Sequence, residues 1–205
     1  MENAASVTAH SVVSSGMRFD DLFDDLESQL EAELGAASRE VAEEEERFRV
    51  GRLELRDRLQ HAKSLDLSLV SGTRLRLRKR ALGRDWLSGE VLDGAAEGTG
   101  AVVPLRSIAG IRFDESAAAA SIQSTDDRVK LTDRLSLGYI LRDFARRRTW
   151  LQVEGAASVG GTVDRVGRDH LDIAVHERGT IRARGNVACI AVVPFSAVDW
   201  LRLQP

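Results

Sequence analysis

Apolar and polar residues alternate along residues 65–69 and 74–78, on either side of the turn sequence Ser71-Gly72. This period of two is typical of half-buried β-strands joined as a hairpin. Similar short apolar runs, separated by glycine-rich or polar turns, continue to the end of the chain. They predict strands at 86–92, 101–103 and 108–113, and a second set at 150–154, 159–166, 171–175, 187–193 and 198–203.

The two sets of strands carry the same sequence blocks. Ala81-Leu82-Gly83-Arg84-Asp85-Trp86-Leu87 corresponds to Arg165-Val166-Gly167-Arg168-Asp169-His170-Leu171, an offset of 84 positions. Ala-Val-Val-Pro stands at 101–104 and again at 191–194, an offset of 90. Leu-Arg-Asp lies ahead of each set, at 55–57 and 141–143. An internal duplication is therefore predicted, in which each copy forms a small closed five-stranded barrel preceded by a helix.

A different period governs the first part of the chain. Apolar residues recur there every three or four positions, which places them on one stripe of a helix. The stripe consists of Phe19, Leu22, Phe23, Leu26, Leu30 and Leu34. Gly35 either breaks this helix or only weakens it, and helical spacing resumes from Val41 to Leu59. The stripe either binds a partner or another copy of the chain, or packs against the chain's own barrel.

These patterns define an α+β fold with five segments. A disordered tail is expected at 1–17, an acidic helical arm at 18–62, the first barrel at 63–113, a linker at 114–130, and a helix plus the second barrel at 131–205. Within the last segment, the helix is expected at 131–148.

Charge is distributed unevenly between the arm and the rest. Residues 1–62 carry 15 acids and 7 bases, whereas residues 63–205 carry 17 acids and 22 bases. The arm and the body are thus expected to present surfaces for different partners, or to neutralise each other.

No stretch approaches the roughly 18 apolar residues of a membrane span. The single Cys189 excludes an intramolecular disulfide. It favours a cytoplasmic protein and, within its apolar run, is expected to be buried.

Basic residues gather on the second predicted strand and the turn after it. They are Arg74, Arg76, Arg78, Lys79, Arg80 and Arg84. Such a face can follow a phosphate backbone, pair with the acidic arm, or simply be solvated. Trp86 and His170 follow equivalent Gly-Arg-Asp turns and are expected to point outward or toward a barrel end. One interpretation is that each ring stacks on a nucleobase. The other is that the ring covers the rim of a barrel or a contact between the barrels, while the aspartate of the turn caps that turn with its side chain.

The sequence contains no motif that is typical of a catalytic site. The four histidines are scattered, and no phosphate-binding glycine loop, His-Glu-x-x-His pattern or nucleophile elbow occurs. His170, Asp172 and His176 have a spacing only loosely suited to a metal. We therefore expect no catalytic residue, no metal, no cofactor and no small-molecule substrate.

The order of one helix and five short strands resembles the Sm-like fold, one of the SH3-like small barrels. Gly161 to Asp169 is similar to the early Sm motif, but the Asn after its turn and the later Arg/Lys-Gly pair are missing, so no RNA-contacting residue is implied. The chain also resembles a family of uncharacterised actinobacterial proteins in three blocks, at 17–26, 83–87 and 164–171. That resemblance implies no activity.

The sequence thus favours a non-catalytic adaptor or regulator that binds protein through the Phe19–Leu34 stripe. The alternative is an RNA-binding Sm-like protein that uses the basic residues 74–84, together with Trp86 and His170.

Overall fold

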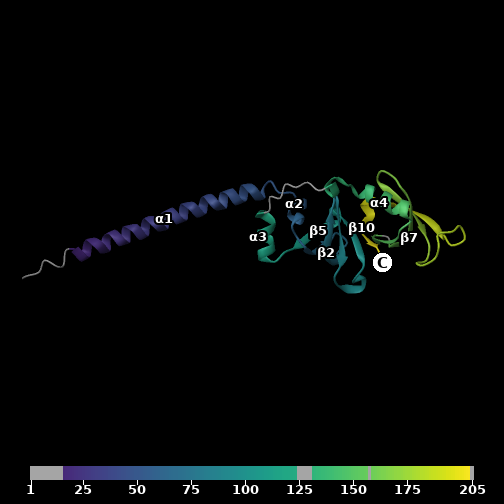
Figure 1. The fold of residues 1–205 in the computed structure, drawn as a ribbon, viewed down its shortest axis with the longest axis horizontal. Coiled ribbons are helices and arrows are strands. Elements are labelled where there is room, and N and C mark those ends of the chain that lie inside the picture. Colours follow the sequence, from purple (N-terminus) through teal and green to yellow (C-terminus); the bar gives the residue numbers. More distant parts are fainter. Residues whose placement is uncertain (1–15, 124–130, 157, 204–205) are drawn as a thin grey trace, which may run out of the picture. The chain divides into compact units, whose positions relative to one another are not determined.

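The computed structural model describes residues 16–123, 131–156 and 158–203, and these residues form a mixed α+β fold (Figure 1). They separate into two units at Arg52 and Leu53. The expected tail, up to residue 15, and the part of the expected linker from 124 to 130 lie outside the described residues.

The first unit consists of the long helix α1, Gly16–Val50. The helix continues through Gly35, where the missing side chain weakens a helix but does not stop it. It ends at Gly51 and Arg52, whose amides donate to the carbonyls of Arg47 and Arg49 at 2.9 and 3.1 Å. Helical structure resumes as the separate short helix α2, Leu55–Gln60, in the second unit. The predicted arm is therefore two helices, with the interruption after Val50.

The second unit is built on one antiparallel sheet of ten strands, in the order β5-β1-β2-β3-β4-β10-β6-β7-β8-β9. The first five strands are β1 Ser64–Leu69, β2 Arg74–Leu82, β3 Trp86–Val91, β4 Gly100–Pro104 and β5 Ile108–Arg112. The other five are β6 Trp150–Gly155, β7 Val159–Val166, β8 His170–Val175, β9 Cys189–Pro194 and β10 Val198–Leu203. A one-turn 3₁₀ helix joins β4 to β5 at Leu105–Ser107 and β9 to β10 at Phe195–Ala197.

The prediction of closed barrels is wrong. Among the described residues, no ladder joins β4 to β5 or β9 to β10, so neither half closes on itself. The physical reason is that the free edge of β4 pairs with β10 of the other half instead. Within the described part of the chain, the sheet consequently has open edges at β5 and β9.

Equivalent turns of the two halves share the same hydrogen bonds. The amide of Gly83 donates to the carbonyl of Trp86 at 2.8 Å, and the amide of Gly167 donates to that of His170 at 2.9 Å. A Cβ at either position would lie under 2.5 Å from the ring that follows, and the clash is costly at Gly83, because the Trp86 ring is buried. The two hairpins predicted from the repeated blocks therefore have matching geometry.

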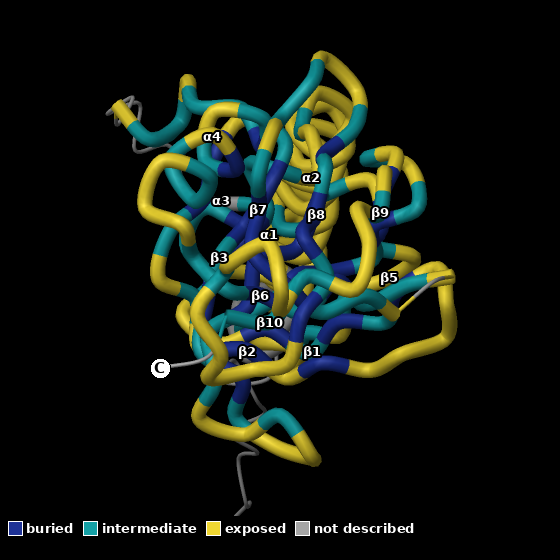
Figure 2. Tube along the Cα trace, turned by 90° about the vertical axis from the view of Figure 1, so that its right-hand side faces the viewer, coloured by how far each residue is buried: buried dark blue, intermediate teal, exposed yellow. Residues whose placement is uncertain are grey.

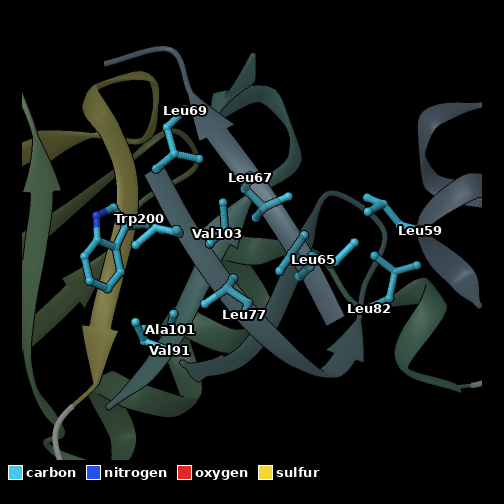
Figure 3. Close-up of a cluster of buried hydrophobic side chains, with 12 residues drawn as sticks. Leu59, Leu65, Leu67, Leu69, Leu77, Leu82, Val91, Ala101, Val103 and Trp200 are labelled. Atoms are coloured by element: carbon cyan, nitrogen blue, oxygen red, sulfur yellow. The ribbon is translucent and has the colours of Figure 1, made fainter. Parts of the chain in front are cut away.

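Each half has its own hydrophobic core, and the two cores exchange side chains across the β4–β10 pair. Trp200 of β10 packs into the first core, beside Leu69, Leu77 and Val91 (Figure 3). In return Trp86 and Val102 from the first half pack into the second core. Buried residues follow the strands, whereas α1 is exposed (Figure 2). The β4–β10 pair is thus a junction that makes the two halves one unit.

Two further helices belong to the second unit. Helix α3, Glu115–Gln123, occupies the first part of the segment predicted as a linker, and Arg58 of α2 donates to Ser121 Oγ of α3 at 3.0 Å. Helix α4, Leu137–Arg147, was expected from 131, but Leu131–Arg134 is a 3₁₀ turn. The amide of Leu137 donates to Asp85 Oδ1 at 2.7 Å, so a residue of the first half caps the helix of the second.

Candidate functional site

The apolar stripe of α1 is exposed to solvent along its described length. Its large side chains are each more than half exposed: Phe23, Leu26, Leu30, Leu34, Val41 and Phe48. Phe19 and Leu22 lie in α1, but their side chains are outside the described part of the structure. Single exposed apolar residues are common on protein surfaces, but an aligned row of this length is not.

Acidic residues flank this stripe. Twelve acids and four bases lie between Gly16 and Val50, a net charge of −8. Arg47 pairs with Glu43 at 3.5 Å, and the guanidinium of Arg52 lies 4.4 Å from the ring centroid of Phe48. The helix therefore presents an apolar row inside a strongly negative surface, which suits an apolar groove with a positive rim.

The predicted basic face is found on β2, where leucines point into the first core and Arg74, Arg76, Arg78 and Arg80 are exposed. Carboxylates on neighbouring strands neutralise much of it. Glu90 accepts from Arg80 at 2.9 Å and from Arg78 at 3.3 Å, and these contacts lower the pKa of Glu90. This face is therefore less positive than the sequence alone indicates.

Lys79 lies apart from those arginines. Its Nζ donates to the carbonyls of Leu59 and Gln60, at 2.5 and 2.6 Å, at the end of α2. A cation at this position satisfies carbonyls that the helix leaves unpaired. Lys79 thus holds α2 against the sheet.

Trp86 is not a stacking platform. It was expected to point outward or toward a barrel end, yet it is 3% exposed in the second core, and its Nε1 donates to the carbonyl of Leu135 at 2.9 Å. The ring instead forms a contact between the two halves of the sheet, as the expected interbarrel contact would, although the halves are not closed barrels. His170, its counterpart, is only partly buried, and its Nδ1 lies 2.9 Å from Asp169 Oδ1. That contact lowers the pKa of Asp169.

A cationic hollow at the start of α4 was missed by the sequence analysis. It measures about 280 Å³, and Arg84, Arg106, Arg142 and Arg168 line it. Asp85 is the one carboxylate among its described lining residues and already accepts the Leu137 amide. Burial lowers the pKa of Arg106, with Asp85 opposing this effect. The signal available in the sequence was that Arg84 and Arg168 occupy equivalent positions of the repeat.

Cys189 was expected to be buried, and this is wrong: it is exposed. The apolar run around it does form a strand, β9, but of that strand only Val193 is buried. The strand lies at the edge of the sheet, so the neighbour that would cover the run is missing from the described chain.

Metal binding and membrane insertion have no support in the described residues. His176 is buried, with Nε2 2.8 Å from Thr162 Oγ1 and Nδ1 3.0 Å from the carbonyl of Glu177, so both ring nitrogens are engaged. Within the described ranges, no group of three or more His, Cys, Asp or Glu is arranged to hold a metal. None of the described helices is long and apolar enough to cross a membrane.

Comparison of the chain with protein-family models, with curated proteins and with solved structures found no match.

Proposed function

We propose that this chain is a non-catalytic adaptor of the cytoplasm that binds a protein partner through the apolar stripe of α1. The observation that carries the proposal is the exposure of Phe23, Leu26, Leu30 and Leu34 on one unbroken helix. Burying such side chains against a partner yields about 25 cal/mol per Å² of apolar surface removed from water. Helix-in-groove binding uses this spacing of anchors.

In this proposal the second unit is a scaffold of two Sm-like units joined edge to edge. The matched hairpins at Gly83 and Gly167, and the identical pairing order of β1–β4 and β6–β9, support the repeat. A packed double core suits a rigid scaffold, because interiors of this kind resist deformation. The partner itself is expected to offer an apolar groove rimmed by Lys or Arg.

The test is a crosslinked capture from the source cells with three full-length proteins. Leu26→Asp with Leu30→Asp places two charges on the stripe. Ser28→Asp with Ala32→Asp adds the same charge on the opposite face, at exposed positions with the same spacing. A partner held by the wild type and the control but not by the stripe variant supports the proposal. Equal capture by all three proteins contradicts it.

RNA binding is the second candidate, and the cationic hollow is the observation that favours it. Four arginines converge there at the start of a helix, where backbone amides also attract phosphate. Arg74 and Arg76 lie exposed on β2 of the same unit, and Arg84 was already among the predicted contacts.

A salt titration with a fluorescent single-stranded RNA tests this candidate. Arg84→Gln with Arg106→Gln should lower the affinity for the RNA. The variant should also reduce the slope of the logarithm of the binding constant against the logarithm of the salt concentration, by about one for each phosphate that it no longer neutralises. Arg146→Gln with Arg147→Gln removes the same charge from residues that pair with Asp143, and should change neither. Absence of RNA affinity at low salt would rule the candidate out.

A further inference from the structure

We propose that the second half of the sheet carries a docking site for a segment of a partner protein in which an acidic residue precedes a helix. The first half already holds a segment of this kind, which is the chain's own stretch 133–137. The groups that hold it recur in the second half, where no described segment fills their place. The chain therefore contains one filled and one open copy of the same recognition site.

An ion pair anchors the acidic end of the bound segment. Nη2 of Arg56, on α2, lies 2.8 Å from Oδ1 of Asp133. Nε of Arg56 also donates to the carbonyl of Gly83 at 3.1 Å, which holds the guanidinium at the turn between β2 and β3. The two side chains of the ion pair are only 20% and 12% exposed, so water and salt screen it little. The site thus selects an acid at this position of the segment.

Three hydrogen bonds hold the rest of the segment where it enters α4. The carbonyl of Leu135 accepts from the amide of Arg84 at 3.0 Å and from Trp86 Nε1 at 2.9 Å. Oδ1 of Asp85 accepts from the amide of Leu137 at 2.7 Å. These bonds reach one peptide carbonyl and one amide at the start of a helix. They therefore recognise a backbone conformation, and a different chain with that conformation can make them.

Each of the holding groups has a counterpart in the second half. By the repeated blocks, they are Arg142 for Arg56, Arg168 for Arg84, Asp169 for Asp85 and His170 for Trp86. Arg142 is held as its counterpart is, because its Nη2 donates to the carbonyl of Gly167 at 3.3 Å. Both turns are also tied down alike, by an amide of the following 3₁₀ turn that donates to the aspartate carbonyl. The second half thus presents the same set of groups in a matching arrangement.

In the second half these groups are open. Within residues 16–123, 131–156 and 158–203, Arg142 has no ion pair and the amide of Arg168 has no acceptor. Asp169 caps no helix there, since its Oδ1 lies 2.9 Å from Nδ1 of the neighbouring His170 and its side chain is 86% exposed. Trp86 is buried, whereas the side chain of His170 is 44% exposed. This difference in exposure is the one expected between a covered site and an uncovered one.

Space for an acidic side chain lies beside Arg142. The cationic hollow of about 280 Å³ has Arg142 and Arg168 in its lining, together with two arginines of the first half. Asp85 is its one acidic residue in the described part of the chain, and the α4 amide already engages that carboxylate. Guanidinium groups gathered around one hollow repel each other, and an incoming carboxylate relieves this repulsion. The role of Asp133 in the first half is therefore left to an incoming acid in the second.

A separate protein suits this site better than the other possible occupants. A second copy has its own segment 133–137 engaged in its first half, so it would lose those contacts in order to offer it. Nucleic acid fits less well, because Asp169 needs a hydrogen-bond donor and repels phosphate. The partner segment is expected to carry an Asp or Glu four residues before the first residue of a helix, as Asp133 precedes Leu137.

Fluorescence anisotropy with a synthetic peptide tests the proposal. The probe is residues 131–141 of this chain with blocked termini and a dye, titrated with the full-length protein. Asp133 and Arg134 are its only charged residues and give no net charge, so general attraction to the acidic α1 does not contribute. Saturable binding is expected. The same peptide with Asp133→Asn should bind at least about tenfold more weakly, because the ion pair with Arg142 cannot form.

Three variants of the full-length protein locate the bound peptide. Arg142→Gln should weaken binding at least about tenfold, as the change in the peptide does. Asp169→Ala should weaken it about fivefold, which is the usual contribution of a helix cap. Arg147→Gln removes the same charge from the next turn of α4, where Arg147 pairs with Asp143, and should leave the affinity unchanged. Equal affinity of the wild type and Arg142→Gln overturns the proposal.

A gain-of-affinity variant keeps the test decisive if the wild type binds weakly. His170→Trp restores the counterpart of Trp86, whose indole donates to the carbonyl of the bound segment in the first half. It should raise the affinity for the peptide several-fold, about the worth of one hydrogen bond, and Arg142→Gln should reverse the gain. A peptide that binds neither the wild type nor His170→Trp overturns the proposal.

Other occupants of the site give different results. Multimers of the full-length chain that Arg142→Gln dissociates in sedimentation velocity would assign the site to a second copy, and a separate partner would be excluded. RNA that binds more tightly than the peptide, with no loss in Asp169→Ala, would assign it to nucleic acid. The stripe variant Leu26→Asp with Leu30→Asp should bind the peptide as the wild type does. Failure of this proposal therefore leaves the function proposed for α1 intact, and the reverse also holds.

Discussion

The sequence Ala-Val-Val-Pro occurs once in each half of the sheet, and the two copies lie in opposite environments. Val102 is 2% exposed between two cores, and Val192 is 63% exposed at an edge. Both strands pair on one side in the same way, β4 with β3 and β9 with β8. The difference comes from the other side, where β4 has β10 and β9 has no strand in the described chain. Burial at this position is set by the neighbouring strand, since the local sequence is identical.

The largest expected effect comes from a charge at each of these two valines. Val102→Lys buries an ammonium in the second core and should lower the free energy of unfolding by more than about 4 kcal/mol. Val192→Lys should change it by less than about 0.5 kcal/mol. Urea unfolding, at a protein concentration where the chain is monomeric, measures the loss of unfolding free energy in both variants. Similar unfolding midpoints would contradict the difference in burial between Val102 and Val192.

The next largest effect is the difference in unfolding free energy lost when each aromatic residue after a Gly-Arg-Asp turn is changed to alanine. Trp86→Ala removes a buried indole and its hydrogen bond to Leu135, for which we expect a loss of about 3–5 kcal/mol in unfolding free energy. His170→Ala should lose about 1 kcal/mol or less, because the imidazole is only partly buried. Thermal unfolding followed by circular dichroism distinguishes these values; a His170→Ala loss as large as that of Trp86→Ala would contradict the comparison.

A smaller effect is expected at the two aspartates of the same turns. Asp85→Ala removes the cap of α4 and should lower the free energy of unfolding by about 1 kcal/mol. Hydrogen exchange at the amide of Leu137 should accelerate in that variant. Asp169→Ala should have no measurable effect on this amide, because the Asp169 carboxylate lies exposed beside His170. Unchanged exchange in Asp85→Ala would show that another group caps the helix.

The smallest effect concerns pH. Arg112 lowers the pKa of Asp66 through a hydrogen bond and its charge, so the folded pKa lies below the unfolded value. The stabilisation is therefore present above the unfolded pKa, and it is lost as the pH falls through the folded one. Asp66→Asn should be less stable than the wild type by under about 1 kcal/mol near pH 6, and this difference should shrink in acid as the pH falls through the folded pKa. Urea midpoints over a series of pH values measure this, and a difference that stays constant in acid would exclude the carboxylate as its cause.

Much of the local structure could be predicted from periodicity. The alternation of leucine with polar or charged residues placed β1 and β2 correctly, and the repeated blocks identified hairpins with the same hydrogen bonds. The stripe of α1 was also predicted, and its described part is a single helix through Gly35. These features depend on residues close in sequence, for which side-chain spacing and turn chemistry are direct signals.

The contacts between the halves could not be predicted in the same way. Whether β4 closes on β5 or pairs with β10 depends on strands about 100 residues apart, and the alternation of each strand is compatible with both arrangements. Three errors share this cause: the closed barrels, the outward Trp86 and the buried Cys189. The cationic hollow was missed because its four arginines come from separate segments that only the junction brings together.

The position of Trp200 also has a consequence for how the chain is made. The first half contains five strands that are synthesised before any strand of the second half, yet its core is completed by Trp200 of β10, the last strand along the described chain. The hydroxyl of Ser107 likewise contacts the carbonyl of Asp199, at 2.6 Å. Synthesis in the N-to-C direction therefore cannot finish the first half ahead of the second. The first half can therefore reach its native packing only after β10 has been synthesised.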